Sequence, residues 1–194
     1  MLHNELNILK RLSHKNIARC LEIIHGNDRI CTINELGNLG QIMEWRELDD
    51  CFKRNPKVTA YIGEKYKLTT LGDITRLIFL EVCEGVKYMH DHNITNRDIK
   101  VDNLICRESK GVGDEVMIVD FTTVRFRGND DISYFPTGTP GFRGPEHQFA
   151  GSDGYSSKAT DVWAVGIAMW VFFHERMPFK GEDDLERDIT AKNV

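Results

Sequence analysis

A short polar stretch restricts the fold of this chain more than any other feature. It runs from Asn96 to Asn103, includes Asp98 and Lys100, and is followed after two apolar runs by Asp120. These residues supply an acid able to accept a hydroxyl proton, a cation for phosphate, and an amide with a second acid for Mg²⁺. Phosphoryl transfer requires such groups, so the spacing predicts a loop that lies beside Asp120.

The segments that follow this loop predict how it is held near Asp120. The runs 104–106 and 116–119 are apolar and are joined by a glycine-containing turn region at 111–114. This pattern favours two short strands connected as a hairpin. Such strands would hold Asn103 and Asp120 close together.

Helical patterns predict the segments on either side of the site. Thr70 and Asp73 match a capping box, and the apolar residues after them recur at helical spacing as far as Met89. Farther along, Thr160 is suited to cap a helix that begins at Asp161 and is apolar on nearly all sides. We expect this second helix to lie in the core.

The first third of the chain predicts smaller elements. Residues 3–12 show the pattern of an amphipathic helix, and the runs 18–24 and 29–34 suit a hairpin because a turn signal lies between them. Segment 46–70 is expected to be an irregular surface insertion, since its polar residues break any apolar period. These elements together indicate the α+β class.

The composition suits a globular domain and gives no support for several kinds of partner. The chain has 194 residues, 41% of them apolar, and a formal charge of −5. This balance gives no support for binding nucleic acid or a membrane surface. The start of the chain has no signal-peptide pattern, and the most apolar run, 162–173, is shorter than the roughly twenty residues that span a bilayer.

The cysteines bear on the compartment. The chain has five of them, widely scattered and without a C-x-x-C pair. Free thiols are therefore favoured over a disulfide or a zinc site. We expect a reducing compartment, which is the cytoplasm or the nucleus.

Four ordered motifs resemble the protein kinase family. Residues 96–103 resemble its catalytic loop, His-Arg-Asp-x-Lys-x-x-Asn, and residues 120–122, Asp-Phe-Thr, resemble its Asp-Phe-Gly motif. Residues 138–146 resemble the end of the family's activation segment. Residues 161–166 resemble the start of its large buried F helix.

The resemblance implies a fold and a domain plan. It implies an α+β, protein-kinase-like domain over residues 1–194, with the hinge and a mainly helical C-lobe in 37–194. Residues 1–36 would be a remnant of the small β-rich N-lobe, with the C helix and two strands. Glu5 on that helix matches the partner of the phosphate-binding lysine, although it also suits a solvated glutamate. The Gly-rich loop, that lysine and the last helices are not found, so we expect a kinase domain truncated at both ends.

The resemblance also implies roles for individual residues. Asp98 would be the catalytic base, Lys100 would steady the transferred phosphoryl group, and Asn103 with Asp120 would hold Mg²⁺. ATP would be bound by a further set of residues: the Glu35 carbonyl and the Gly37 amide at adenine, Gln41 near the ribose, Ile105 beneath the base, and Val119 with Asp120 along the pocket. An ordinary glycine-containing loop at 35–42 is the alternative to a hinge.

The resemblance favours protein serine and threonine hydroxyls as substrates. Lys100 and Thr139 are typical of Ser/Thr kinases, and segment 155–166 most resembles the calcium/calmodulin-dependent and related groups. Asp102 suits either a basic substrate or a solvated surface position. MgATP would be the phosphate donor.

Arg97, beside the catalytic aspartate, indicates control by an upstream kinase or another regulatory protein, because arginine pairs well with phosphate. Phe135 occupies the position where the family usually has a phosphorylated threonine. Ser133, Tyr134 or Thr137 would have to replace it.

Two departures from the family pattern keep a different class of function open. Asn96 replaces a histidine and needs hydrogen-bond partners if it is buried, while Thr122 replaces a flexible glycine. A pseudokinase or a truncated fragment that acts as an interaction scaffold is therefore the alternative. Small-molecule phosphotransferases are less well supported, because they lack the activation-segment motif at 138–146.

Overall fold

The computed structural model describes residues 10, 12–26, 28–47, 50–126, 131–149 and 153–179. The predicted helix at 3–12, including Glu5, lies outside these residues except for its last positions. The middle of the activation segment, 127–130, and the end of the chain from residue 180 also lie outside them.

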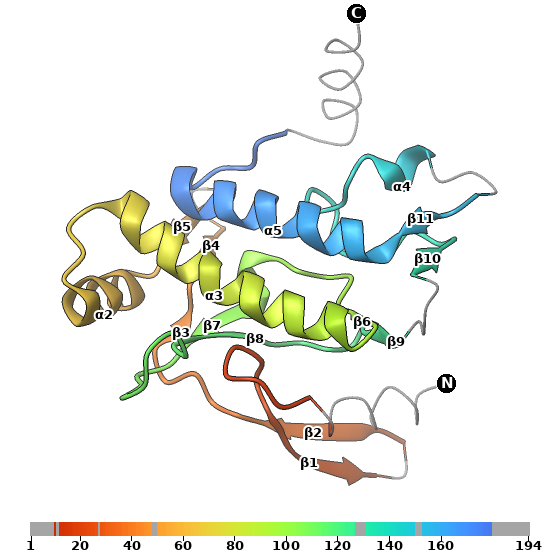
Figure 1. The fold of residues 1–194 in the computed structure, drawn as a ribbon, viewed down its shortest axis with the longest axis horizontal. Coiled ribbons are helices and arrows are strands. Elements are labelled where there is room, and N and C mark those ends of the chain that lie inside the picture. Colours follow the sequence, from red (N-terminus) through yellow and green to blue (C-terminus); the bar gives the residue numbers. More distant parts are fainter. Residues whose placement is uncertain are drawn as a thin grey trace, which may run out of the picture.

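Two long helices form the centre of the molecule. Helices α3 (Leu71–Asp91) and α5 (Ser157–His174) lie side by side, and α2 (Pro56–Tyr66) lies at one end of α3 (Figure 1). The strands β7 (Leu104–Cys106) and β8 (Val116–Ile118) run along the other side of α3. The buried apolar residues of these elements form one continuous core.

The strands of the described residues form small antiparallel sheets. The pairs are β1 (Cys20–His25) with β2 (Ile30–Asn34), β4 (Met43–Arg46) with β5 (Cys51–Arg54), β6 (Ile94–Thr95) with β9 (Arg125–Phe126), and β10 (Ile132–Ser133) with β11 (Tyr155–Ser156). A three-stranded sheet has the order β3 (Gly40–Gln41), β7, β8. The predicted hairpins at 18–34 and 104–119 are thereby confirmed. Short helices η1 (Val101–Asn103) and α4 (Glu146–Phe149) complete the fold.

Helix α3 forms where its sequence predicts. The Thr70 side chain accepts a hydrogen bond from the Asp73 amide at 3.1 Å, and its hydroxyl donates to the Asp73 carboxylate at 2.6 Å. This is the predicted capping arrangement, which satisfies a donor at the helix start. One face of the helix, including Ile78, Val82 and Met89, is buried against the core.

Helix α5 corrects two predictions. Its cap is Ser156, which accepts a hydrogen bond from the Ala159 amide at 3.1 Å, and the helix begins at Ser157. The predicted cap, Thr160, is wrong: it lies in the first turn and donates to the Ser156 carbonyl at 3.0 Å. The helix is also not buried on all sides, because Val162 is 62% exposed and a strip through Trp170 and Phe173 faces outward.

Segment 46–70 is regular, which corrects the prediction of an irregular insertion. It contains the second half of the β4–β5 hairpin and helix α2, with Asn55 as the cap that accepts from the Lys57 amide at 3.0 Å. Val58 and Ile62 are fully buried at helical spacing. These two apolar side chains pack a largely polar helix against the core. Two positions are too few to show a helical period in the sequence.

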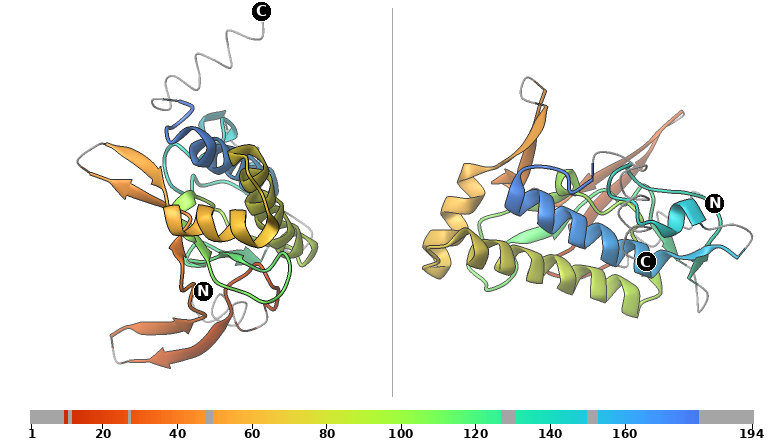
Figure 2. Two further views of the ribbon diagram at one scale, coloured as in Figure 1. Left: turned by 90° about the vertical axis from the view of Figure 1, so that its left-hand side faces the viewer. Right: turned by 90° about the horizontal axis from the view of Figure 1, so that it is seen from above.

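Two hairpins extend away from the helices. Hairpins β1–β2 and β4–β5 project from the body on the same side (Figure 2). The β4–β5 hairpin is stiffened by the rings of Trp45 and Phe52, which meet edge to face at 4.8 Å. Among the described residues, no helix is both long and apolar enough to cross a membrane.

Candidate active site

The loop at 96–103 is fixed by a buried carboxylate on α5. Asp161 is fully buried and accepts hydrogen bonds from the amides of Asn96 at 2.9 Å and Arg97 at 2.7 Å. His90, near the end of α3, contacts the same carboxylate at 2.8 Å. Arg97 has φ +68°, a left-handed conformation that a side chain disfavours. The bonds to Asp161 stabilise this turn and so orient the residues that follow it.

Three polar side chains meet beside this turn. The Asp98 carboxylate oxygen Oδ1 accepts hydrogen bonds from both the amide and the hydroxyl of Thr139, each at 2.7 Å. The Lys100 ammonium donates to the Thr139 hydroxyl at 3.0 Å and lies 3.4 Å from Asp98 Oδ2. The structure therefore places Asp98 and Lys100 next to the activation segment, in a partly buried site.

Asn103 lies on the other side of Asp98. Its side-chain nitrogen donates to the Asp98 carbonyl at 2.9 Å and lies 3.4 Å from Asp98 Oδ2. Because the nitrogen is used in this way, the amide oxygen is left to face a cation. The Asn103 carbonyl accepts from the Val119 amide at 2.9 Å, which places Asp120, the next residue, beside the loop.

Asp120 occupies an exposed turn. It has φ +60°, and its Oδ1 accepts from the amide of Thr122 at 3.1 Å and from the Thr122 hydroxyl at 2.8 Å. Its second carboxylate oxygen and the Asn103 amide oxygen are hard oxygen donors of the type Mg²⁺ prefers. This donor set fits Mg²⁺, which keeps waters and substrate phosphates as its other ligands. The next side chain, Phe121, is buried in the core.

The predicted hinge lies directly against strand β7. The Leu39 amide donates to the Cys106 carbonyl at 3.0 Å. A Cβ added to Gly37 would lie 2.8 Å from both the Cys106 carbonyl and the Ile105 side chain, so only glycine fits there. The close approach places the Gly37 backbone against Ile105 on β7, the central strand of the β3–β7–β8 sheet. Glu35 continues from β2, where its amide donates to the Arg19 carbonyl at 2.8 Å.

The remaining predicted nucleotide contacts lie on the same sheet. Gln41 on β3 pairs with Ile105, and its side-chain nitrogen donates to the Asp102 carbonyl at 2.9 Å. Val119 follows β8 and is half-buried. Gln41 and Ile105 thus lie on β3 and β7, Val119 and Asp120 follow β8, and Glu35 and Gly37 lie in the segment that leads into β3.

Asn96 is accommodated only in part. Its Oδ1 accepts from the Asp98 amide at 3.0 Å, whereas its buried Nδ2 has no partner among the described residues. An unsatisfied buried donor costs about 1–3 kcal/mol. Asn96 was predicted to need hydrogen-bond partners, and its side-chain oxygen has one while its side-chain nitrogen has none among the described residues.

Two positioning residues were not predicted from the sequence. The sequence places Asp161 only at the start of a predicted helix and of the motif at 161–166, and His90 belongs to no motif. Their roles depend on α3, α5 and the loop meeting in space, with Asp161 lying 65 residues from Asn96. The only signal in the sequence was an acidic residue at the start of an apolar helix, where burial of a charge requires partners.

A family comparison agrees with this geometry. The model of the protein kinase domain matches residues 1–193. The chain belongs to the protein kinase family. The family assignment and the α+β kinase-like fold expected from the motifs are thereby confirmed.

Curated relatives are Ser/Thr kinases of the kind expected. Myosin light chain kinase 3 of Danio rerio is 30% identical over 98% of this chain and 23% of its own length. The ovarian-specific serine/threonine-protein kinase Lok of Drosophila melanogaster is 27% identical over 92% of this chain and 34% of its own length. Myosin light chain kinase family member 4 of Homo sapiens is 26% identical over 98% of this chain. The kinase chain described here therefore spans less than half the length of these relatives.

Proposed function

We propose that this kinase domain binds MgATP and transfers the γ-phosphate to serine or threonine hydroxyls of a protein. The observation that carries the proposal is the double hydrogen bond from Thr139 to Asp98 Oδ1, with Lys100 beside it. Such an arrangement fixes an acid and a cation in one place before any substrate arrives, which is what positional catalysis requires.

Each polar group has a proposed task. Thr139 takes both bonds to Asp98 Oδ1, so Oδ2, which has only 3.4 Å contacts to Lys100 and Asn103, is assigned to accept the substrate hydroxyl and orient it for attack. Lys100 offsets the negative charge of the transferred group. Asn103 and Asp120 would hold Mg²⁺, which neutralises charge on the nucleotide phosphates when it is bound.

The base of ATP is assigned to the hinge beside β7. The Glu35 carbonyl and the Gly37 amide would bond adenine, with Ile105 beneath it, and Gln41 would lie toward the ribose. The absence of a side chain at Gly37 supports this assignment, because the hinge backbone is held against Ile105.

A regulatory step is supported at Thr137. The Arg97 guanidinium lies 3.4 Å from the Thr137 hydroxyl, and Arg97 also donates to the Thr123 carbonyl at 2.8 Å. A phosphate on Thr137 would gain a charge-assisted bond from Arg97 and tie the activation segment to the catalytic loop. Ser133 is buried at 1% exposure, which makes it a poor substrate for an upstream kinase.

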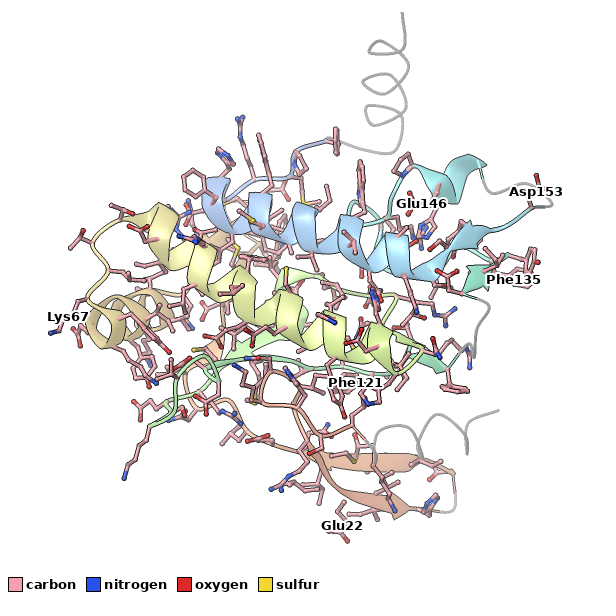
Figure 3. All side chains as sticks on the ribbon, in the orientation of Figure 1. Glu22, Lys67, Phe121, Phe135, Glu146 and Asp153 are labelled. Carbon is pink, nitrogen blue, oxygen red and sulfur yellow. The ribbon has the colours of Figure 1, made fainter. Side chains whose placement is uncertain are left out.

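An interaction scaffold is the second candidate, and two observations favour it. The Thr122 amide and hydroxyl both bond Asp120 Oδ1, which ties down one of the two oxygens needed at the metal. The aromatic ring of Phe135 is 79% exposed and points outward beside β10, as a partner-binding side chain would (Figure 3).

A titration with nucleotide separates the two candidates. Binding of MgATP raises the melting temperature by mass action. For the enzyme, we expect a Mg²⁺-dependent rise that is lost in Asp120→Ala. We also expect phosphorylation of a Ser/Thr peptide to fall by about 10²-fold or more in Asp98→Asn, which keeps the shape of the side chain.

The outcomes are distinct. In one, the melting temperature rises with Mg²⁺ and ATP while no peptide is phosphorylated, both with and without a phosphate on Thr137. That result would leave a nucleotide-binding scaffold. A folded sample with neither response would contradict the proposed enzyme.

A further inference from the structure

Arg107, just beyond β7, connects three segments that meet behind the hinge. Its Nε donates to the Asp114 carbonyl at 2.8 Å, and its Nη2 donates to the Lys15 carbonyl at 3.1 Å. Its Nη1 forms an ion pair with Glu35 Oε1. All three nitrogens of the guanidinium are therefore used, each on a different part of the chain.

Glu35 is held on its other side as well. Its Oε2 lies 3.4 Å from the Arg19 amide, and its own amide donates to the Arg19 carbonyl at 2.8 Å. The peptide that carries the Glu35 carbonyl thus lies between a fixed side chain and the end of the β1–β2 hairpin. Rotation about the N–Cα bond of Glu35, which would swing this carbonyl away, would also carry the side chain off Arg107.

The backbone after Glu35 is fastened to the same strand that carries Arg107. The Leu39 amide bonds the Cys106 carbonyl, and the Glu108 amide donates to the Asn38 side chain at 2.9 Å. Residues 105 and 107 are two positions apart on β7 and its continuation, so their side chains point the same way. Ile105 lies against Gly37, and Arg107 pairs with Glu35. One supports the base from below and the other holds the hinge by its side chain.

The surroundings make the ion pair effective. The side chains of Arg107 and Glu35 are 18% and 31% exposed, so solvent screens their attraction less than at an open surface. Asp114 lies 3.9 Å from the same guanidinium. The nearby ammonium of Lys15 is occupied by Glu84 at 2.7 Å and does not compete for Glu35.

We propose that Arg107 is a positioning residue for the nucleotide base: its fork holds Glu35 so that the Glu35 carbonyl and the Gly37 amide face adenine. This inference rests on the proposed nucleotide site. Arg107 belongs to none of the kinase motifs in the sequence, and its position is marked only by its contacts. Lysine would not replace it, because an ammonium lacks the planar geometry that reaches three acceptors at once.

The test compares ligands that use different halves of the site. We would measure the binding of adenosine and of MgATP by calorimetry for the unchanged protein, Arg107→Gln, Arg107→Lys, Glu35→Gln and the double variant Arg107→Gln/Glu35→Gln. We expect each single variant to weaken both ligands about tenfold, which is about 1.4 kcal/mol. The double variant should bind both ligands no more weakly than the single variants, since each change removes the same ion pair between Arg107 and Glu35.

Two comparison variants separate positioning from a general loss of structure. Arg29→Gln removes an ion pair whose side chains are 75% and 74% exposed, and it should leave both ligands unchanged. Asp120→Asn should weaken MgATP but leave adenosine unchanged, because it touches only the proposed metal end.

Hydrogen exchange supplies a readout that needs no ligand. We expect the amides of Glu35 and Leu39 to exchange at least about fivefold faster in Arg107→Gln, as local opening becomes easier. If the unchanged protein binds neither ligand, the proposed nucleotide site fails while this exchange result still decides what Arg107 holds. Unchanged exchange at both amides, or additive losses in the double variant, would overturn the proposal.

Discussion

Buried acids occur at two sites along helix α3, and the two sites are built differently. At the catalytic loop, Asp161 stands alone and accepts three hydrogen bonds, two of them from backbone amides. Near the middle of α3, Glu81 and Glu115 are two buried acids whose charges interact. At the loop one acid is satisfied by several donors, whereas the second site places two acids near each other.

The paired acids hold together elements remote from the catalytic loop. Glu81 Oε2 accepts from the Val116 amide at 2.8 Å and from the Asn16 side chain at 3.0 Å. Glu115 accepts from the Tyr66 hydroxyl at 2.8 Å and forms an ion pair with Lys65. Four segments of the chain therefore meet at this pair.

Only one of these two acids carries a proton at neutral pH. Burial, together with the nearby Glu115 carboxylate, raises the pKa of Glu81 to about 8. Burial would also raise the pKa of Glu115, but its interaction with Glu81 and the bonds that Lys65 and Tyr66 donate hold it below its ordinary value. At neutral pH, Glu81 carries the proton and Glu115 carries the charge. A buried acid therefore orients a catalytic loop by accepting hydrogen bonds from backbone amides. A protonated acid beside a charged one instead makes a structural junction sensitive to pH.

The largest effect is expected from Asp161→Ala. The change leaves the amides of Asn96 and Arg97 and the ring of His90 without their acceptor. Because each unpaired buried donor costs about 1–3 kcal/mol, the free energy of unfolding should fall by at least about 3 kcal/mol. Urea unfolding followed by circular dichroism measures it.

The control for this change is Asp91→Ala, which removes an exposed acid paired with Lys87 on α3. The urea midpoint of this variant should not move measurably. A loss below about 1 kcal/mol in Asp161→Ala would show that the loop is held by something else.

The next effect is a pH dependence that Glu81 confers. The folded protein keeps the Glu81 proton up to about pH 8, whereas the unfolded chain releases it near 4.5. The free energy of unfolding should therefore fall as pH rises through this window, by about 1.4 kcal/mol per pH unit. The lowered pKa of Glu115 acts in the opposite sense, but only below pH 4.5.

The variant Glu81→Gln should remove this slope, because its amide keeps a donor toward Glu115 without titrating. Urea unfolding at several pH values between 5 and 8 would measure the slope. The same slope in the variant as in the unchanged protein would exclude Glu81 as its origin.

A smaller effect is expected from Lys65→Met. The ammonium of Lys65 bonds Glu115 and the carbonyls of Ser109 and Gly111. Its removal should destabilise the fold by about 1.5 kcal/mol, and by more at pH 8 than at pH 5, since the negative charge of the pair is no longer balanced. Thermal melts at the two pH values would show the difference. Equal losses would mean that Lys65 acts through packing alone.

The smallest effect is expected from Glu84→Gln, three residues beyond Glu81 on the same helix. Glu84 pairs with Lys15 at 2.7 Å, yet both side chains are 42% exposed. An ion pair at the surface contributes about 0–1 kcal/mol, so the melting temperature should barely change and its pH dependence should be kept. A large loss would erase the contrast between buried and surface acids.

The sequence predicted those parts of the fold that depend on neighbouring residues. The capping of α3 by Thr70 and Asp73 is local, and so is the spacing that puts Asp98 and Lys100 in one loop. The start of α5 was missed because two adjacent serines precede Thr160, and the first one takes the cap. Helix α2 was missed because only Val58 and Ile62 mark its buried face.

The contacts that could not be predicted join distant segments. The ion pair of Arg107 with Glu35 spans 72 residues, and the bond from Asn16 to Glu81 spans 65. Neither side chain of such a pair carries a local pattern, because its partner is chosen only when the helices and strands pack together. The individual roles assigned to Asp98, Asn103 and the hinge residues stay predictions that the proposed binding and activity measurements test.

The small sheet β3–β7–β8 carries a consequence for cooperativity. Its first strand leads from the hinge, its second carries Ile105, and its third ends just before Asp120. A base that tightens the hinge onto β7 and a metal that tightens the turn after β8 would order the same ladder of hydrogen bonds. By thermodynamic reciprocity, whatever factor adenine adds to the affinity for Mg²⁺, Mg²⁺ must return to adenine.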